Sequence, residues 1–270
     1  MPELPEAETI ARGLERALRN RVIESVEIRR RSNVIAPWGM RVDRILEKET
    51  IAHVGRRGKY VVILLGSGRR LIVQLRMTGR LLVLRPGERP PPASHVVLWT
   101  RGGEGLAFAD VRKLGRVRIA GRHEAWDEAL GLEPLAPGFT VGAFTAMLAG
   151  RTTPVKVLLL DQRRIAGIGN IYACEALWEA GIRPTRPAKA VSRAAAQRLH
   201  RAIVDVLTRA IELRGSSIDD YVDADGDRGG FQDALRVYGK RGMPCPRCGR
   251  AIVRTVLAGR GTWWCRRCQR

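Results

Sequence analysis

The order of apolar and polar positions along the chain predicts a helix followed by a series of strands. The helix is expected to start near Pro5 and to end near Asn20, because five apolar residues recur at helical spacing: Ala7, Ile10, Ala11, Leu14 and Leu18. The stretch "KYVVILLGSGRRLIVQLRMTG" then holds two apolar, β-branched runs around a Gly-Ser-Gly turn, which predicts a hairpin. The runs "HVVLWT", "GLAFADV" and "GRVRIA" extend this β pattern to about residue 120.

The pattern changes to helical spacing after Pro134 and Pro137 and stays helical from about residue 140 to 213. The last of these helices presents one apolar face, formed by Leu199, Ile203, Val206, Leu207 and Ala210. The segment 214–233, "RGSSIDDYVDADGDRGGFQD", is rich in Gly and Asp and is expected to form a mobile surface loop. We therefore predict an α+β fold with domains at residues 1–133, 134–235 and 236–270.

Composition points to a polyanionic partner. The chain has 48 Lys+Arg against 27 Asp+Glu, a formal net charge of +21, and enough hydrophobic residues, 45%, to bury a core. An Arg-rich genome accounts for part of this excess, but residues 236–270 carry ten Lys or Arg and no acidic residue, which favours nucleic acid. No apolar run approaches the roughly 18 residues of a membrane span and no secretory signal is visible, so we expect no membrane contact and a cytoplasmic, nucleoid-associated location.

Two Cys-x-x-Cys hooks near the C-terminus predict a metal site. Cys245 and Cys248 form the first hook and, after sixteen residues, Cys265 and Cys268 form the second. Four thiolates in this pattern can surround one structural Zn²⁺ and stiffen a segment that has no core of its own. Two disulfides are the alternative, which an intracellular chain with a fifth cysteine, Cys174, disfavours. Cys174 itself is expected to be a small buried residue.

Two glycine-containing stretches are candidates for phosphate binding. The turn "AGRG" presents Arg260, whose guanidinium can bind a phosphate through two hydrogen bonds. In "LLLDQRRIAGIGNIYACEALWEAGIRP", Asn170 is placed to cap a second helix that would run to Gly181, and amides at a helix N-terminus point toward an anion. The alternatives are that Arg260 is an arginine in an ordinary turn, and that the second stretch is a helical hairpin without a phosphate site.

Seven motifs together resemble the formamidopyrimidine-DNA glycosylase family of base-excision repair enzymes. In chain order they are "PELPE", "RRGKY", "LRMTG", "DVRKLG", "LLLDQRRIAGIGNIYACEALW", "VYGKRG" and "AGRGTWWCRRCQR". The resemblance covers essentially the whole chain. It implies an N-terminal β-sandwich with flanking helices, a helix-two-turns-helix domain, a C-terminal zinc finger, and damaged double-stranded DNA bound between the lobes by a monomer.

The resemblance also gives the N-terminus a chemical role. If Met1 is removed, Pro2 becomes a secondary amine with an ordinary pKa near ~8, against ~10.4 for a lysine, so it is a nucleophile at neutral pH. Glu3 would act as general acid and base, Glu6 would hold the N-terminal region, and Lys59 would contact phosphate and assist strand cleavage. Without the family pattern, a capped acidic first turn and a strand lysine explain these residues.

The remaining implied residues bind DNA. Met77, Arg112 and Leu114 match the side chains that fill the gap left by an extruded nucleotide, although Leu114 replaces an aromatic residue and core packing is the alternative for both apolar residues. The other matches are phosphate ligands: Lys156, Asn170, Tyr238, Arg254 and Arg260, of which Arg260 also belongs to the catalytic set. Gln74 stands where the family has a phosphate-binding histidine. The segment 214–233 matches the loop that closes over an everted purine.

The resemblance favours a bifunctional DNA glycosylase and abasic-site lyase for oxidised purines such as 8-oxoguanine and formamidopyrimidines, with cleavage by β,δ-elimination. An oxidised-pyrimidine enzyme of the endonuclease VIII type is the nearest rival, which usually has Gly where this chain has Leu4. A zinc-ribbon protein that binds nucleic acid without catalysis is the second rival. The intact set of Pro2, Glu3, Glu6 and Lys59 argues against it.

Overall fold

The contacts of the chain divide it into two units. A computed structural model describes residues 2–36 and 41–270. The first unit comprises the chain up to Asp127 together with Leu213–Gln232, and the second comprises Glu128–Glu212 and Asp233–Arg270. The segment 213–232 therefore has its contacts with the first unit, although the sequence places it after the helices of the second.

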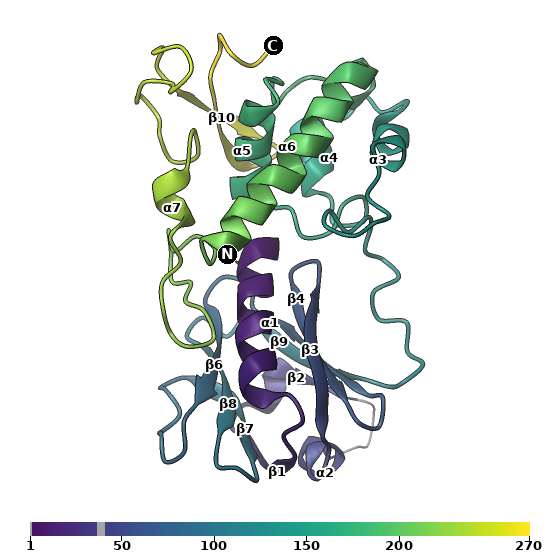
Figure 1. Cartoon of the computed structure of the whole chain (residues 1–270), viewed down its shortest axis with the longest axis vertical. Coiled ribbons are helices and arrows are strands. Elements are labelled where there is room, and N and C mark those ends of the chain that lie inside the picture. Colours follow the sequence, from purple (N-terminus) through teal and green to yellow (C-terminus); the bar gives the residue numbers. More distant parts are fainter. Residues whose placement is uncertain (1, 37–40) are drawn as a thin grey trace. The chain divides into compact units, whose positions relative to one another are not determined.

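The first unit contains one long helix and two β-sheets (Figure 1). Its elements are α1 (Leu4–Leu18), β1 (Ile23–Ile28), η1 (Arg31–Asn33), β2 (Val34–Ile35), α2 (Val42–Leu46), β3 (Ile51–Arg57), β4 (Tyr60–Leu65), β5 (Arg70–Gln74), β6 (Gly79–Leu84), β7 (Ser94–Thr100), β8 (Gly105–Asp110) and β9 (Arg116–Ala120). The predicted hairpin is confirmed, because β4 and β5 pair antiparallel across the Gly-Ser-Gly turn.

The two sheets form the predicted β-sandwich. One has the strand order β1-β7-β8-β6 and the other has the order β2-β9-β5-β4-β3, in which only β2 and β9 pair in parallel. Both sheets contribute to a single buried core, with Val61 and Ile63 from one and Leu98 and Phe108 from the other. The alternation of buried and half-buried positions along β4 reflects the side-chain period of a strand with one face on this core.

Helix α1 completes the core of the first unit. All five residues of its predicted apolar stripe are buried, and the helix contacts β3, β4 and β6. A capping box starts it, because the Glu3 side chain accepts a hydrogen bond from the backbone N–H of Glu6 and the Glu6 side chain accepts one from the backbone N–H of Glu3. Asn20 follows the helix with φ of 63°, so the chain turns away where the sequence predicted.

The second unit is mainly helical, as the spacing predicted. Its elements are α3 (Val141–Leu148), α4 (Val155–Leu160), α5 (Asn170–Glu179), η2 (Ala188–Ala190), α6 (Arg193–Glu212), β10 (Val253–Leu257) and β11 (Arg260–Trp264), with α7 (Phe231–Ala234) at the boundary between the units. The predicted apolar face of α6 is buried, and this helix packs on α3 and α5. Among the described residues, no helix is long and apolar enough to cross a membrane.

The finger segment, residues 236–270, depends on α5 for its position. Its hairpin, β10 and β11, turns through Ala258 and Gly259, which both have positive φ as a two-residue turn of this kind requires. The Glu175 side chain on α5 is 3% exposed and accepts hydrogen bonds from the backbone N–H groups of residues 236, 237 and 238 at 2.8, 3.0 and 2.8 Å. Burial raises the pKa of Glu175, while these three N–H groups act in the opposite direction.

We expect Glu175→Gln to destabilise the second unit. A glutamine keeps the size of the side chain but offers one acceptor oxygen in place of two, so at least one buried N–H loses its partner, at a cost of about 1–3 kcal/mol. Urea unfolding of the zinc-loaded full chain, followed by tryptophan fluorescence, measures the change.

Glu179→Gln is the matched control, because it makes the same chemical change on the same helix at a carboxylate that is 37% exposed and paired with Arg247. Equal stability of the two variants would contradict the role given to Glu175.

Candidate active site and nucleic-acid interface

Three connecting loops of the first unit meet at one end of its sandwich. Strand register shows this, because Tyr60 at the start of β4 pairs with Gln74 at the end of β5, and Gln74 pairs with Arg116 at the start of β9. The Gly58-Lys59 turn, the 75–78 loop that carries Met77 and the 111–115 loop that carries Arg112 and Leu114 all leave the sheets beside this row. Four residues that are scattered in sequence are thus brought to one edge.

The first turn of α1 lies at the same end. Helix α1 runs antiparallel to β3, because Glu15 near its end binds the backbone N–H of Val54, whereas Glu8 near its start binds Arg56 at 2.8 Å. Moving toward the start of α1 therefore means moving along β3 toward the Lys59 turn. This register brings Pro2, Glu3 and Glu6 to the edge that carries Lys59.

The Pro2-Glu3 segment is held by hydrogen bonds from buried groups. Pro2, Glu3 and Glu6 are all buried, and the backbone N–H of Glu3 donates to the Glu6 side chain at 2.7 Å. The other carboxylate oxygen of Glu6 accepts from the backbone N–H of Ser216 at 2.9 Å. Glu6 thus joins the N-terminus to a segment more than 200 residues away. Met1 lies outside the described residues.

The segment 213–232 buries some of its own polar side chains, which its Gly- and Asp-rich composition does not indicate. The Asp223 side chain is 3% exposed and accepts from the backbone N–H groups of Asp225 and Asp227, while Arg214 donates to it. Tyr221 is 7% exposed, and burial, followed by the negative charge of Glu6, raises the pKa of its hydroxyl. Asp223 and Tyr221 therefore fold inward instead of being solvated.

The 111–115 loop exposes its side chains on a buried polar frame. The Asp110 side chain, 1% exposed, accepts from the backbone N–H groups of Arg112 and Gly115 and from the Thr78 hydroxyl. On the other side, the amide of Asn33 donates to the carbonyl oxygens of Lys113 and Gly115 at 3.1 and 2.7 Å. The 75–78 and 111–115 loops are therefore fixed to each other through Asp110.

This frame holds at the surface the three residues that are predicted to fill the gap left by an extruded nucleotide, which we call the wedge residues: Met77, Arg112 and Leu114. Met77 is 36% exposed, Leu114 is 42% exposed and Arg112 is exposed, so the core-packing interpretation of Met77 and Leu114 does not hold. Asp110, Thr78 and Asn33 are not among the residues that the sequence motifs predicted for the site. Asp110 could have been suspected as a carboxylate at the end of a buried strand before an exposed turn, but nothing near Asn33 in the sequence indicates its partners.

Gln74 is engaged within the sheet. Its side-chain amide donates to the Tyr60 hydroxyl at 3.1 Å, across the pair that joins β4 to β5. The sheet therefore takes one of the two N–H bonds of this amide.

In the second unit, Lys156 and Asn170 together hold β11. The Lys156 ammonium is buried and donates to Asn170 Oδ1 at 2.6 Å, to Thr262 Oγ1 at 2.7 Å and to the Gly261 carbonyl at 3.1 Å. The Asn170 side chain also donates to the Gly261 carbonyl at 3.0 Å. Each of the three ammonium N–H bonds has a protein acceptor, so a contact between Lys156 and a DNA phosphate would require one of them to be exchanged.

The prediction that Asn170 caps the second helix is wrong. Gly169 is the N-cap of α5, with φ of −130°, and Asn170 is the first helical residue. The physical reason is that the Asn170 side chain has partners outside the helix, Lys156 and Gly261, which compete with the local N–H groups that a cap would bind. The predicted end at Gly181 is close, since α5 ends at Glu179.

The finger segment presents a basic surface. Of its ten Lys and Arg residues, Lys240 is half-buried and the other nine are exposed, including Arg254 and Arg260. Arg260 starts β11 directly after the turn, and the Arg254 guanidinium lies over the Trp263 ring, 5.5 Å from its centroid, which is within cation–π range. Tyr238 is half-buried and packs on the same ring with a centroid distance of 4.4 Å.

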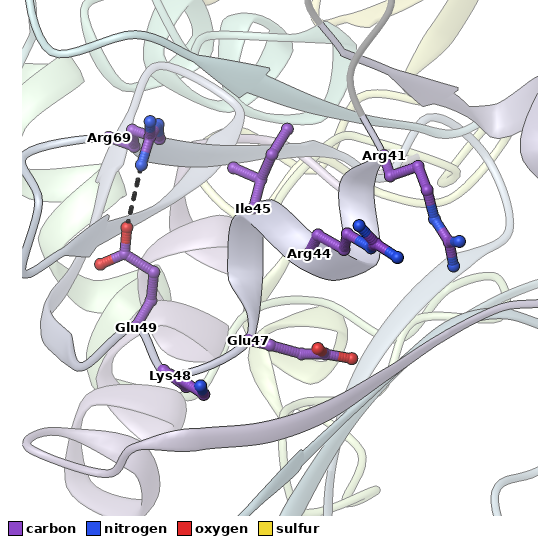
Figure 2. A pocket seen from close by; sticks show the side chains of 7 residues that line it. All are labelled: Arg41, Arg44, Ile45, Glu47, Lys48, Glu49 and Arg69. Atoms are coloured by element: carbon purple, nitrogen blue, oxygen red, sulfur yellow. Dashed lines mark hydrogen bonds and ion pairs between the residues drawn. The ribbon is translucent and has the colours of Figure 1, made fainter.

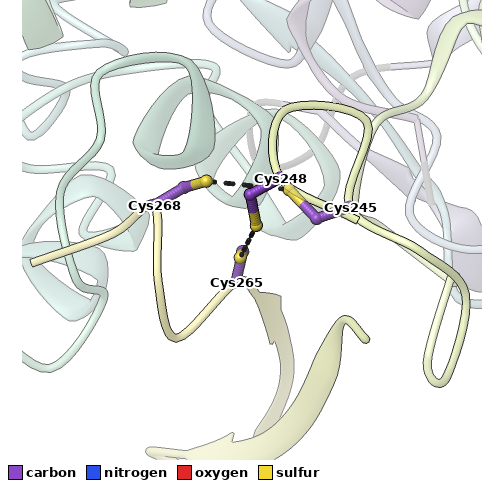
Figure 3. A group of neighbouring side chains, drawn as sticks. All are labelled: Cys245, Cys248, Cys265 and Cys268. Carbon is purple, nitrogen blue, oxygen red and sulfur yellow. Dashed lines mark hydrogen bonds between the residues drawn. The ribbon is translucent and has the colours of Figure 1, made fainter. Parts of the chain in front are cut away.

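The four cysteines of the two hooks converge on one point (Figure 3). Their sulfur atoms all lie within 4.8 Å of one another, with 3.9 Å between Cys245 and Cys268 and 3.5 Å between Cys248 and Cys265. A zinc–sulfur bond of ~2.3 Å places tetrahedral ligands about 3.8 Å apart, so the cluster fits one structural Zn²⁺ and not the predicted alternative of two disulfides. Cys174 is fully buried in the adjoining apolar cluster, as predicted.

One zinc ligand is already biased toward its thiolate form. Burial acts to raise the pKa of Cys245, but four hydrogen bonds, of which the one from the Trp178 indole has the largest effect, lower that pKa to about 7. Burial raises the pKa values of Cys265 and Cys268, so Cys245 differs from these two ligands in favouring the thiolate, the form that binds a metal ion.

A pocket beside α2 holds none of the candidate residues. It is lined by Arg41, Arg44, Ile45, Glu47, Lys48, Glu49 and Arg69 (Figure 2). Its charges partly cancel, because Arg69 pairs with Glu49 at 3.3 Å and Arg41 pairs with the nearby Asp43. Helix α2 lies at the end of the first unit opposite the start of α1 (Figure 1).

Comparison with known proteins gives the same assignment along the whole chain. The family model of the formamidopyrimidine-DNA glycosylase N-terminal domain matches residues 1–117, the H2TH domain of the same glycosylase matches residues 130–222, and the zinc finger found in FPG and IleRS matches residues 242–270. A curated relative from Moorella thermoacetica, named formamidopyrimidine-DNA glycosylase, is 45% identical over 258 residues, which cover 94% of each chain.

Solved structures are similar over the same length. The MutM (Fpg) protein of Thermus thermophilus has a TM-score of 0.88 at 39% identity, and the match covers 99% of this chain and 98% of that one. A Lactococcus lactis FPG mutant, solved in complex with a Fapy-dG containing DNA, has a TM-score of 0.92 at 35% identity, and the match covers 99% of both chains. This protein therefore belongs to the formamidopyrimidine-DNA glycosylase family of enzymes.

Proposed function

We propose that the protein is a bifunctional DNA glycosylase and abasic-site lyase that excises oxidised purines, typified by 8-oxoguanine and formamidopyrimidines, from duplex DNA. The observation that carries this proposal is the grouping of Pro2, Glu3, Glu6 and Lys59 at one edge of the first unit, beside the exposed Met77, Arg112 and Leu114. The Lactococcus lactis relative has been solved both with a Fapy-dG containing DNA and with an oxidized pyrimidine containing DNA, so the choice of the purine class rests on the family motif with Leu4.

The proposed chemistry starts at the nitrogen of Pro2 once Met1 is absent. This nitrogen attacks the sugar C1′, the bond from C1′ to the damaged base breaks, and the base leaves with a proton. Opening of the sugar ring breaks the C1′–O4′ bond and leaves an iminium, which is cationic because the amine is secondary. Glu3 is the proton donor to O4′. Its carboxyl group belongs to the residue next to Pro2, and the helix start keeps it there.

Strand cleavage follows from the same iminium. Its positive charge acidifies the C2′ proton, and loss of that proton expels the 3′ phosphate, after which a second elimination expels the 5′ phosphate. Glu6 supports these steps by position, because its hydrogen bonds to the backbone N–H groups of Glu3 and Ser216 set the N-terminus against the segment 213–232. Lys59, in the adjacent turn, is placed to neutralise phosphate charge.

The exposed loops supply access to the target nucleotide. A base inside a duplex has to be extruded before C1′ can be reached, and the space that it leaves has to be filled. Met77 and Leu114 are apolar and exposed, and Arg112 can hydrogen-bond to the base left unpaired. We infer that the segment 213–232 contacts the extruded base, since it is bonded to Glu6.

The second unit contributes phosphate binding. Arg254 and Arg260 are exposed on the hairpin, and Lys156 with Asn170 fixes the strand that begins at Arg260. The four cysteines hold the zinc ion that keeps this hairpin folded. Action on chromosomal DNA as a monomer would place the protein with the nucleoid in the cytoplasm.

Substrate choice separates this proposal from its nearest rival. An endonuclease VIII type enzyme would excise thymine glycol faster than 8-oxoguanine, whereas we expect the opposite order when both lesions are placed in the same duplex. A zinc-ribbon protein without catalytic activity would bind both duplexes and cleave neither.

Replacing Pro2 should abolish covalent trapping. Wild-type protein incubated with borohydride and a duplex that contains 8-oxoguanine opposite cytosine, or an abasic site, should form a reduced adduct visible by gel electrophoresis. Pro2→Gly should lose it, because a primary amine at a flexible glycine replaces the constrained secondary amine. Pro5→Ala, a proline change within the same helix start, should retain it. Trapping at the wild-type level by Pro2→Gly would refute the assigned nucleophile.

Shortening the wedge should affect duplex substrates selectively. We expect Leu114→Ala to slow excision of 8-oxoguanine from a duplex by about tenfold, since filling the stack offsets an extrusion cost of a few kcal/mol. Cleavage at an abasic site in single-stranded DNA should change little, because no stack has to be opened. Ile35→Ala, at a residue that is 49% exposed elsewhere in the first unit, is the control. Equal loss on both substrates would contradict the wedge role.

Loss of a zinc ligand should weaken DNA binding. We expect Cys248→Ala to fall below one zinc per chain by elemental analysis and to bind an abasic-site duplex at least about tenfold more weakly, because the hairpin with Arg254 and Arg260 loses its support. Cys174→Ala removes a cysteine outside the cluster and should keep both zinc and affinity. Wild-type affinity in a zinc-free Cys248→Ala protein would overturn this role of the finger segment.

A further inference from the structure

A tryptophan of helix α5 contacts the zinc site from outside the finger segment. Trp178 lies in the last turn of α5, is 4% exposed, and donates its indole N–H to the Cys245 sulfur at 3.4 Å. The same indole belongs to the apolar cluster that includes Cys174, Cys245 and Cys265. The helical part of the second unit and the metal site thus share a hydrogen bond.

The hook that carries Cys245 also fixes the indole in place. Arg247 stands inside this hook, and its guanidinium lies 4.0 Å from the centroid of the Trp178 ring. The same guanidinium donates to the carbonyl oxygens of Trp178 and Glu179, at 2.7 and 2.9 Å, at the C-terminal end of α5. Trp178 therefore binds Cys245 of this hook, and Arg247 of the same hook binds Trp178.

The chemistry of a four-thiolate site makes this hydrogen bond useful. Four thiolates bring more negative charge than one Zn²⁺ neutralises, and Cys245 is buried at 2% exposure, where water cannot compensate. An N–H group aimed at the sulfur offsets part of that charge and orients the ligand, and side chains that bind metal ligands in this way commonly change metal affinity by about 10–100-fold. Packing alone would require the ring but not its N–H.

We propose that Trp178 is a positioning residue of the zinc site, which holds the Cys245 thiolate through its indole N–H and slows the release of zinc. This role goes beyond the proposed function and does not depend on it. It also gives α5 a direct influence on the metal, since a change at the end of this helix alters the surroundings of a zinc ligand.

Trp178→Phe tests the role, because phenylalanine keeps an aromatic ring and removes the N–H. The zinc-loaded full-length protein is mixed with an excess of a metallochromic chelator, and the rate of zinc transfer is followed by absorbance. We expect release to be about tenfold faster than in wild type. Trp264→Phe is the matched control, since Trp264 is similarly buried and adjoins Cys265 in sequence but donates its N–H to the Thr255 hydroxyl. It should release zinc at close to the wild-type rate.

A spectroscopic measurement separates the hydrogen bond from packing. In cobalt-loaded protein, loss of an N–H donor to a thiolate raises the energy of the sulfur lone pair, so the sulfur-to-cobalt charge-transfer band of Trp178→Phe should move to longer wavelength. The band of Trp264→Phe should not move. If Trp178→Phe does not fold, benzothienylalanine at position 178 keeps the shape of the indole and lacks the N–H. An unshifted band, or equal acceleration of zinc release in both variants, would overturn the proposal.

Discussion

The candidate site depends on one buried carboxylate, that of Glu6. Its two oxygens accept hydrogen bonds from the backbone N–H of Glu3 and from that of Ser216, which belong to opposite ends of the sequence of the first unit. A carboxylate at 2% exposure is costly unless it is fully hydrogen-bonded, so both segments have to be present for either to be stable there. This requirement places Pro2 beside the segment 213–232 and fixes Pro2 and Glu3, although residues so near a chain end are usually mobile.

In the second unit, buried polar side chains of helix α5 likewise bind a segment that is distant in sequence. Glu175 accepts three backbone N–H groups of the finger segment, Asn170 binds the Gly261 carbonyl, and Trp178 donates to Cys245. The finger segment is too short to bury enough apolar surface to fold alone, so a metal ion, an apolar cluster shared with α5 and hydrogen bonds to that helix hold it. The backbone of the hairpin is thereby fixed to α5, while the side chains of Arg254 and Arg260 stay exposed.

The sequence predicted regular elements well because their signals are local. The apolar stripe of α1, the hairpin of β4 and β5 and the buried face of α6 all follow from spacing within a few residues. The four cysteines were found for the same reason, since their hooks are short and their chemistry is narrow. The motifs that resemble the family were found as strings of neighbouring residues, and the family comparisons confirm that assignment.

Errors and omissions arose where a polar side chain binds a distant partner. Asn170 was expected to cap its own helix, but Lys156 and Gly261 take its side chain. The Asp-rich composition of segment 214–233 likewise does not show that the Asp223 side chain is buried, where it accepts hydrogen bonds from nearby backbone N–H groups and from Arg214. Asn33 reaches across more than 80 residues to hold the 111–115 loop, which no local pattern can show.

The site of covalent attachment to DNA shows whether Pro2 performs the chemistry. Borohydride-trapped complex with an abasic-site duplex can be digested with nuclease and protease, and the modified peptide can be identified by mass spectrometry. We expect the sugar remnant on an N-terminal peptide that begins at Pro2. A remnant on the Lys59 peptide, or Met1 still attached to Pro2 in the trapped protein, would contradict it.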